Sequence, residues 1–262
     1  MGFRSLSALV VVALLWLALS GCEQGQRLLL PIVKSASPGG VFVIPASSDG
    51  DDRVYLTIDD GPSVYTGELL DLLAKYGATA TLFLHTDEIQ DTGQITRAIA
   101  EGHNLGHHMP KDRDWSRDDQ DTFSRHFFRS HCQLAAFGPG YTGYFRPPMG
   151  QFNQETMAQP ISRINKEANT SYIMASFLPW DAGGLTEGPV QKVNAAVAFR
   201  YGWGLGQVSR PGDIVVFHDG PKLKRTQNSI VSIRTFLDAL EKRGLRAVAL
   251  PASPTDTSMC EG

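Results

Sequence analysis

The 262-residue sequence predicts an α/β fold in which about seven parallel strands form a barrel and helices pack outside it. Three observations support this prediction. Apolar, strand-like runs alternate with helix-like stretches between residues 53 and 250. The 42 % hydrophobic composition is enough for one large core. Several strand-like runs end in an acid, an imidazole or a guanidinium group, as expected where barrel strands carry chemistry at their carboxyl ends.

Seven short runs have the character of buried strands. In chain order they are Val54–Asp59, Ala80–His85, Asn104–His108, Thr142–Arg146, Ser171–Leu178, Asp213–His218 and Arg246–Leu250. Their alternation with helices is typical of parallel strands. Seven strands favour a barrel over an open sheet, although periodicity alone leaves both arrangements open.

Three of the intervening stretches are predicted helices. Tyr65–Tyr76 carries four leucines on one face. Ser229–Lys242 has apolar side chains at helical spacing and ends before Gly244. The third predicted helix is Phe123–Leu134.

The amino-terminal segment predicts export. Arg4 precedes an apolar run at residues 8–19 that is too short to span a bilayer comfortably and has the form of a signal peptide. The run leads into Leu-Ser-Gly-Cys, which resembles a bacterial lipoprotein signal with Cys22 as the lipidated residue. An ordinary secretory signal is the alternative. The predicted parts of the chain are a signal peptide at 1–21, a tether and lead-in without elements at 22–52, one domain at 53–252 and a polar tail at 253–262.

Export and composition limit the partners. A lipid chain on Cys22 would anchor the domain to a membrane facing the periplasm or the cell exterior. In that oxidising compartment, Cys132 and Cys260 either pair or remain free thiols. The net charge of -3 argues against nucleic acid, which requires a basic face. With no second domain apparent, we expect a monomer.

Two adjacent carboxylates end the first predicted strand, where residues 57–62 read Thr-Ile-Asp-Asp-Gly-Pro. Side chains alternate along a strand, so Asp59 and Asp60 point in different directions. One carboxylate can then bind a metal ion while the other takes a proton. By itself, Asp-Asp-Gly-Pro could equally be only a turn.

Three further segments carry chemistry. Residues 102–112 hold three histidines and end in an acid, which indicates a metal site. Arg146 keeps its charge and can orient a carboxylate, and the two prolines after it lack N–H groups, which leaves the Met149 N–H free to point at a ligand. His218 at the exit of a buried strand suits proton transfer near neutral pH.

In this order, the segments resemble the motifs of the polysaccharide deacetylase family, carbohydrate esterase family four, whose domain is the NodB homology domain. Residues 57–62 resemble the first motif, Arg-Pro-Pro-Met-Gly at 146–150 the third, and Val-Val-Phe-His-Asp at 215–219 the fifth. Leu-Pro-Trp-Asp at 178–181 is a weaker match to the fourth. The resemblance covers roughly residues 53–250 and implies a distorted (β/α) barrel of about seven strands.

The family's second motif, Gly-His-Glu-Ile-Gly-Asn-His-x-x-x-His, is altered in this chain. The resemblance makes His108 a metal ligand, but it places Asp112 where the family has its second histidine ligand. The implied metal ligands are therefore Asp60, His108 and Asp112. His103 and His107 are interpreted as strand and turn residues.

Asp112 leaves two interpretations open. A carboxylate is an acceptable Zn²⁺ ligand, so the expected cofactor is one divalent ion, Zn²⁺, with Mn²⁺, Co²⁺ or Ni²⁺ as alternatives. Two carboxylates would acidify bound water less and shift preference toward Mn²⁺. The alternative is a damaged site. Among the other histidines, His85 ends a strand on the same side but matches no motif, while His126 and His131 are assigned to a helix surface or to packing.

The resemblance implies metal-assisted hydrolysis of an acetyl amide. Asp59 would take the proton of the attacking water, and Arg146 would keep Asp59 ionised and placed. The Met149 N–H would help to hold the oxyanion. His218 would protonate the leaving amine, and Asp181 would orient His218 and raise its pKa.

The expected function is removal of acetyl groups from an N-acetylated polysaccharide such as peptidoglycan or an exopolysaccharide. Val216 would line the pocket for the acetyl methyl group, and Trp180 would lie beneath the sugar rings. One alternative is an esterase for O-acetylated polysaccharides such as xylan. Another is a non-catalytic wall-binding protein on the same scaffold, although such a binder need not keep a base, its orienting arginine and an acid.

Overall fold

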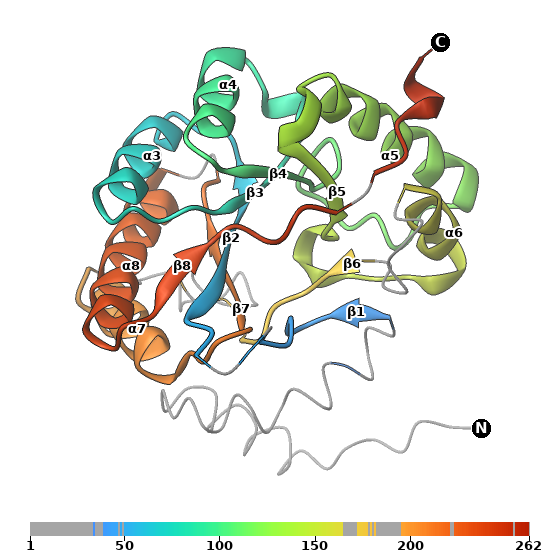
Figure 1. Ribbon diagram of the computed structural model, residues 1–262. Coiled ribbons are helices and arrows are strands. Elements are labelled where there is room, and N and C mark those ends of the chain that lie inside the picture. The colour runs from blue at the N-terminus through green and yellow to red at the C-terminus, as the bar shows by residue number, and fades with distance from the viewer. Residues whose placement is uncertain are drawn as a thin grey trace.

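The computed structural model describes residues 34, 39–46, 48, 50–164, 172–177, 179, 181, 195–220, 223–253 and 255–261. Within these residues, strands occupy the middle and helices lie around them (Figure 1). The strands are β1 Gly40–Val41, β2 Arg53–Gly61, β3 Thr81–Leu84, β4 Asn104–His107, β5 Tyr141–Phe145, β6 Tyr172–Ile173, β7 Ile214–His218 and β8 Arg246–Val248. The helices are α3 Thr66–Lys75, α4 Thr92–Ala100, α5 Gln120–Ala135, α6 Gln154–Ile164, α7 Ala195–Val208 and α8 Leu223–Lys242. Short 3₁₀ turns include η1 Thr86–Glu88, η3 Pro148–Gly150 and η5 Ser258–Cys260.

The strands follow the course of an incompletely closed barrel. The larger sheet has the order β5-β4-β3-β2-β7, with β8 also paired to β2, and all of these ladders are parallel. β1 and β6 form a separate parallel pair. The segment containing β6 spans the two edges, because Ser176 N–H donates to Ile214 O at 2.8 Å and Arg146 Nε donates to Ile173 O at 3.1 Å. The predicted α/β fold with parallel strands is confirmed.

All seven predicted strands are present, but two details differ from the prediction. The sixth strand is only Tyr172–Ile173, and the outermost residues of the predicted range, 171 and 178, lie outside the described residues. β1, at Gly40–Val41, falls in the lead-in where no element was predicted. Its two residues are too few for an alternating pattern, so the sequence offers no periodicity to detect there.

The three predicted helices correspond to α3, α5 and α8, with shifted starts. α3 buries Leu69, Leu70 and Leu73. α5 starts before the predicted Phe123 because Asp119 caps it, accepting the Thr122 N–H at 2.8 Å. α8 begins at Leu223, before the predicted Ser229. Residues 223–228 carry no apolar stripe, so the sequence pattern does not reveal this earlier start. In the described part of the chain, no helix has the length and apolar character needed to cross a membrane.

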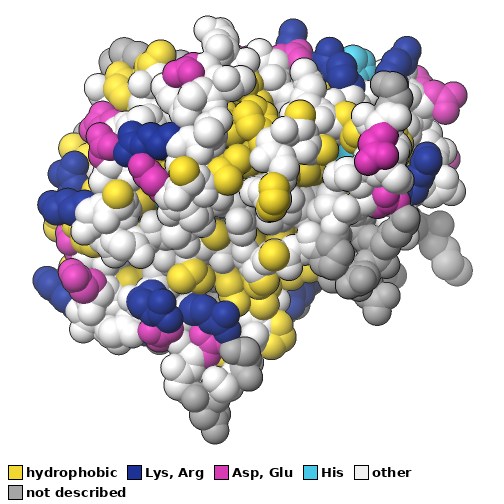
Figure 2. Space-filling model, turned by 45° about the horizontal axis from the view of Figure 1, so that its top comes forward, with side chains coloured by type: hydrophobic (Ala, Val, Ile, Leu, Met, Phe, Trp, Pro, Cys, Tyr) yellow, Lys and Arg dark blue, Asp and Glu magenta, His cyan; other side chains and the backbone are white. Residues whose placement is uncertain are grey.

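Charged side chains on the surface are of mixed sign. On the face drawn in Figure 2, Lys and Arg lie beside Asp and Glu and do not form a large patch of one sign. Arg97, for example, pairs with both Asp71 and Glu101 at 2.6 Å.

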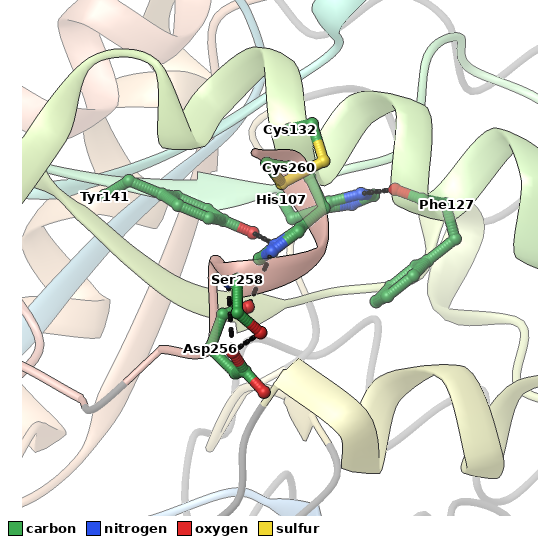
Figure 3. Close-up of a disulfide and its surroundings, with 8 residues drawn as sticks. His107, Phe127, Cys132, Tyr141, Asp256, Ser258 and Cys260 are labelled. Atoms are coloured by element: carbon green, nitrogen blue, oxygen red, sulfur yellow. Dashed lines mark hydrogen bonds between the residues drawn. A yellow bond between two sulfur atoms is a disulfide. The ribbon is translucent and has the colours of Figure 1, made fainter. Parts of the chain in front are cut away.

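A disulfide joins Cys132 in α5 to Cys260 in η5, so the paired alternative holds (Figure 3). The tail also contacts the core through His131, whose Nε2 lies 3.0 Å from Asp256 O. The Nδ1 of the same ring lies 2.9 Å from the Tyr141 hydroxyl. The polar tail is therefore attached to the domain by a covalent bond and by hydrogen bonds.

Replacing both Cys132 and Cys260 with serine is expected to destabilise the domain by about 2–5 kcal/mol. The bond joins residues 128 positions apart, and such a cross-link restricts the unfolded chain. Urea unfolding of the oxidised protein and of the double variant measures the difference. Equal unfolding midpoints and slopes would show that the disulfide adds no stability.

Candidate active site

The ends of three neighbouring parallel strands bring Asp60, His85 and His108 together. His85 follows β3, and its N–H donates to Gly61 O in β2 at 2.8 Å. His108 follows β4, and its N–H donates to Leu84 O in β3 at 3.1 Å. These two hydrogen bonds extend the ladders past the strand ends, so the register alone places both imidazoles beside the Asp60 carboxylate.

The three side chains form a compact and buried set of donors. Asp60 Oδ1 lies 3.4 Å from His85 Nε2 and 3.3 Å from His108 Nε2. One potential ligand atom from each residue lies within 4.8 Å of the other two. Burial raises the pKa of Asp60, but the imidazoles beside it hold that pKa well below its usual range. One ionised carboxylate and two imidazoles suit a divalent ion such as Zn²⁺.

The structure does not bring Asp112 into this group. Asp112 is exposed, whereas the three clustered residues are each at least 92 % buried, with at most 8 % of their surface exposed. Met109 has a φ of 64° and a proline follows it, so the chain turns sharply directly after His108. His85, which matched no family motif, is thus the third member of the cluster, and Asp112 lies outside it.

Asp59 pairs with Arg146, while its neighbour Asp60 lies beside the two imidazoles. Arg146 Nη1 donates to Asp59 Oδ1 at 2.6 Å and to Thr57 Oγ1 at 2.8 Å. The other guanidinium nitrogens donate to the carbonyl oxygens of Ile173 and Met174. Because four acceptors fix the guanidinium in place, the Asp59 carboxylate has a fixed orientation as well. The two adjacent carboxylates therefore have different partners, as the sequence predicts.

His218 and Asp181 form a second ion pair. His218 lies opposite Asp59 in the β2–β7 register. Its Nδ1 lies 2.9 Å from Asp181 Oδ1, and its backbone N–H donates to Asp181 Oδ2 at 2.8 Å. Ser229 Oγ also donates to Asp181. Burial lowers the pKa of His218, but the charge and hydrogen bond of Asp181 outweigh burial and raise this pKa to about 9.

Asp219 is a buried acid to which the sequence analysis gave no role. Its backbone N–H donates to Asp59 O at 2.7 Å, and its carboxylate accepts hydrogen bonds from the Ser63 and Thr66 hydroxyls. Burial raises the pKa of Asp219 to about 6. Asp219 fixes the loop between β2 and α3, and with it the ends of the strands that carry Asp59 and His218. Its position directly after His218, at the end of the same buried strand, is the sequence feature that could have marked Asp219 as part of the site.

The remaining histidines near the motif make structural contacts. His107 Nε2 lies 2.9 Å from Phe127 O, a contact visible in Figure 3, and its Nδ1 accepts the Met109 N–H. Burial lowers the pKa of His107 to about 3, so its ring is neutral. His103 Nδ1 accepts the Ala80 N–H at 3.0 Å. These contacts agree with the interpretation of His103 and His107 as strand and turn residues.

Of the residues predicted to contact the substrate, the structure describes Met149 and Val216 but not Trp180. Met149 has a φ of 58° within η3, and 59 % of its surface is exposed. Val216 is buried in β7, two residues before His218, so the two side chains share a face of the strand. Trp180 and Cys22 lie outside the described residues. The roles assigned to these four residues stay predictions.

Comparisons with known proteins find similarity to carbohydrate deacetylases. The sequence profile described as polysaccharide deacetylase matches residues 46–164. The chain is 28 % identical over 221 residues to a chitooligosaccharide deacetylase of Sinorhizobium fredii, covering 79 % of this chain and 94 % of the relative. It is 26 % identical over 225 residues to a peptidoglycan-N-acetylglucosamine deacetylase of Bacillus cereus, covering 83 % and 94 %.

A solved deacetylase structure has a similar fold. The Bc1960 peptidoglycan N-acetylglucosamine deacetylase matches with a TM-score of 0.65 at 22 % identity, over 81 % of this chain and 91 % of that one. Such a likeness extends the shared fold well beyond the residues that the profile matches. Residues 46–164 thus match the polysaccharide deacetylase family model, and the chain shares the fold of this solved deacetylase.

Proposed function

We propose that the protein is a metal-dependent deacetylase that hydrolyses acetamido groups of a polysaccharide containing N-acetylglucosamine. The observation that carries the proposal is the division of roles between two adjacent carboxylates. Asp59 is paired with Arg146, and Asp60 lies between two imidazoles. A protein that only binds carbohydrate needs neither arrangement, so this division favours an enzyme over a non-catalytic wall-binding protein.

The donor set fits a divalent metal ion, because buried oxygen and nitrogen atoms converge at the ends of β2, β3 and β4. Asp60 and His108 would hold the ion together with a third ligand. When bound, a divalent ion would polarise the acetyl carbonyl and lower the pKa of a water molecule. Zn²⁺ suits these ligands, and Mn²⁺, Co²⁺ and Ni²⁺ are alternatives.

The protein's own groups divide the proton transfers between them. Asp59 accepts the proton of the attacking water, and Arg146 holds Asp59 in place for that step. The Met149 N–H, the first backbone donor after two prolines, donates to the developing oxyanion. Asp181 accepts a hydrogen bond at His218 Nδ1, which leaves Nε2 to protonate the departing nitrogen.

The substrate class is supported by the two relatives. Their names specify chitooligosaccharide and peptidoglycan N-acetylglucosamine, and both substrates carry an acetamido group on a glucosamine ring. An amide releases a poorer leaving group than an ester, so it depends more on protonation of the leaving atom. The hydrogen-bonded His218–Asp181 pair would supply that proton to a leaving amine.

Acetate release from N-acetylglucosamine oligomers is expected to stop on chelation and to return when Zn²⁺, Mn²⁺ or Co²⁺ is added. Asp59→Asn is expected to lower the rate by about 10²–10⁴-fold, because the proton acceptor is lost. Acetylated xylan oligosaccharides serve as the comparison substrate, and faster release from them would favour the O-esterase. If the metal-loaded protein releases no acetate from either substrate, the proposed function is wrong.

We also propose that Cys22 is lipidated and that the mature protein is a membrane-anchored monomer outside the cytoplasm. The support is the apolar run at residues 8–19 followed by Leu-Ser-Gly-Cys. Intact mass spectrometry of protein from the membrane fraction should find an amino-terminal diacylglyceryl cysteine. Cys22→Ser should abolish that modification, and an unmodified wild-type amino terminus at another residue would contradict lipidation.

A further inference from the structure

We infer that His85 is the third ligand of the metal ion, in the role that the family's second motif gives to a histidine at the position of Asp112. The inference rests on the metal-dependent function proposed above and concerns which residues hold the ion. Three independent features of the described residues support it: the orientation of the His85 ring, the spacing of the donor atoms and the position of Asp112.

The His85 ring is held in the orientation that a metal ligand needs. Its Nδ1 lies 3.2 Å from Met109 O, and a carbonyl only accepts hydrogen bonds, so Nδ1 carries the proton. In the neutral ring, the form that binds a metal, the lone pair is then on Nε2. This Nε2 is buried, and it has no hydrogen-bond partner within the part of the chain that the structure describes. A buried nitrogen without a partner is costly unless something else occupies its lone pair.

His108 is held in the same way. Its Nδ1 lies 2.8 Å from Arg146 O, which again leaves Nε2 with the lone pair. Metal-binding histidines usually donate their other N–H to a carbonyl or a carboxylate, which fixes the tautomer and the ring. The two rings lie side by side, with centroids 4.7 Å apart. His85 therefore has the same supporting contact as the ligand that the family motif identifies.

The two donor distances from Asp60 also fit a tetrahedral ion. Ligand atoms about 2.0–2.1 Å from Zn²⁺ at tetrahedral angles are about 3.3–3.4 Å apart. The distances from Asp60 Oδ1 to His85 Nε2 and His108 Nε2 are 3.4 and 3.3 Å. When both rings are neutral with the proton on Nδ1, the Nε2 lone pairs of His85 and His108 face the negatively charged oxygen of Asp60, and the three groups repel one another. A dication bound between them would be attracted to all three.

Asp112 is then not needed as a ligand. It is exposed and lies outside the cluster. One carboxylate and two imidazoles leave more positive charge on the ion than two carboxylates and one imidazole would. The predicted shift toward Mn²⁺ therefore does not apply, and these ligands favour Zn²⁺.

The test measures Zn²⁺ affinity of the full-length protein by competition with a chromogenic chelator, without substrate. His85→Gln keeps a polar side chain at this position but is a poor zinc ligand, and Asp112→Asn is the matched control. We expect His85→Gln to weaken Zn²⁺ binding by more than about 100-fold, beyond the range of a residue that only supports a ligand. Asp112→Asn should stay within about threefold of the wild type.

A second measurement on the wild-type protein does not depend on how any variant folds. ¹⁵N NMR of the imidazole nitrogens, with and without Zn²⁺, counts the Nε2 atoms bound to metal. Two such atoms are expected if His85 binds and one if Asp112 takes its place. A single bound Nε2, or near-wild-type affinity in His85→Gln together with a large loss in Asp112→Asn, would overturn the inference.

Failure of the inference can be told apart from failure of the proposed function. Zinc bound through His85 without acetate release would refute the deacetylase and leave the ligand assignment standing. Zinc-dependent acetate release that survives His85→Gln would support the deacetylase and refute His85 as a ligand. A wild-type protein that binds no divalent metal would refute both.

Discussion

Replacing Arg146 with methionine is expected to lower kcat/KM for acetate release by about 10²–10⁴-fold, the range for losing a positioned base. The same change should destabilise the fold by about 3–5 kcal/mol, because it leaves a buried carboxylate without its cation. Asp59 is 4 % exposed, and Arg146 is paired with it at 2.6 Å. Steady-state kinetics and urea unfolding measure the two effects separately.

A double-mutant cycle tests whether Arg146 acts through Asp59. If it does, Asp59→Asn combined with Arg146→Met should cost little more activity than Asp59→Asn alone. Arg146→Lys is the matched control, since it keeps the charge but cannot reach four acceptors in one plane, and its loss should be intermediate. Independent, additive losses in the double variant would show that Arg146 does not work by holding the base.

The paired carboxylates and the arginine could be predicted because each depends on a short stretch of sequence. Asp59 and Asp60 are adjacent at a strand end, and alternation along the strand predicts different partners for them. In the structure Asp60 has a φ of 68°, so the backbone there also departs from a regular strand. Arg146 and His218 each end a predicted strand, and the run before His218 is strongly apolar. Parallel strands bring such ends to one edge, so their meeting follows from the fold class. The structure adds the partners and distances, which no single segment of sequence contains.

His85 could not be assigned in this way, because its role depends on the register between strands. The sequence shows a histidine at the end of a strand, and the same is true of His108. Only the pairing of Gly61 with Leu84 places His85 beside the carboxylate of Asp60. The motif spacing pointed instead to Asp112, because it assumes that the loop after β4 folds back over the site. The turn at Met109 determines where that loop goes, and a positive φ at methionine has no sequence signature.

The high-pH limit of activity is expected to follow His218. Burial lowers the pKa of this imidazole, but Asp181 raises it to about 9, and the negative charge of Asp60 contributes. A general acid works only while protonated, so activity is present below this pKa and is lost as pH rises through it. A metal ion bound at Asp60 offsets that charge, so the limb of the pH–rate profile should lie below pH 9 in the loaded enzyme.

Asp181→Asn removes the charge that does most to raise the pKa of His218. We therefore expect the high-pH limb of kcat/KM to move down by about one pH unit or more, with kcat about 10²-fold lower. Ser229→Ala is the control, because it removes one hydrogen bond to Asp181 and leaves the charge, so its limb should move much less. A limb that stays in place in Asp181→Asn would mean that a group other than His218 limits the rate at high pH. Asp181 would then only hold the end of β7, where it accepts the His218 backbone N–H.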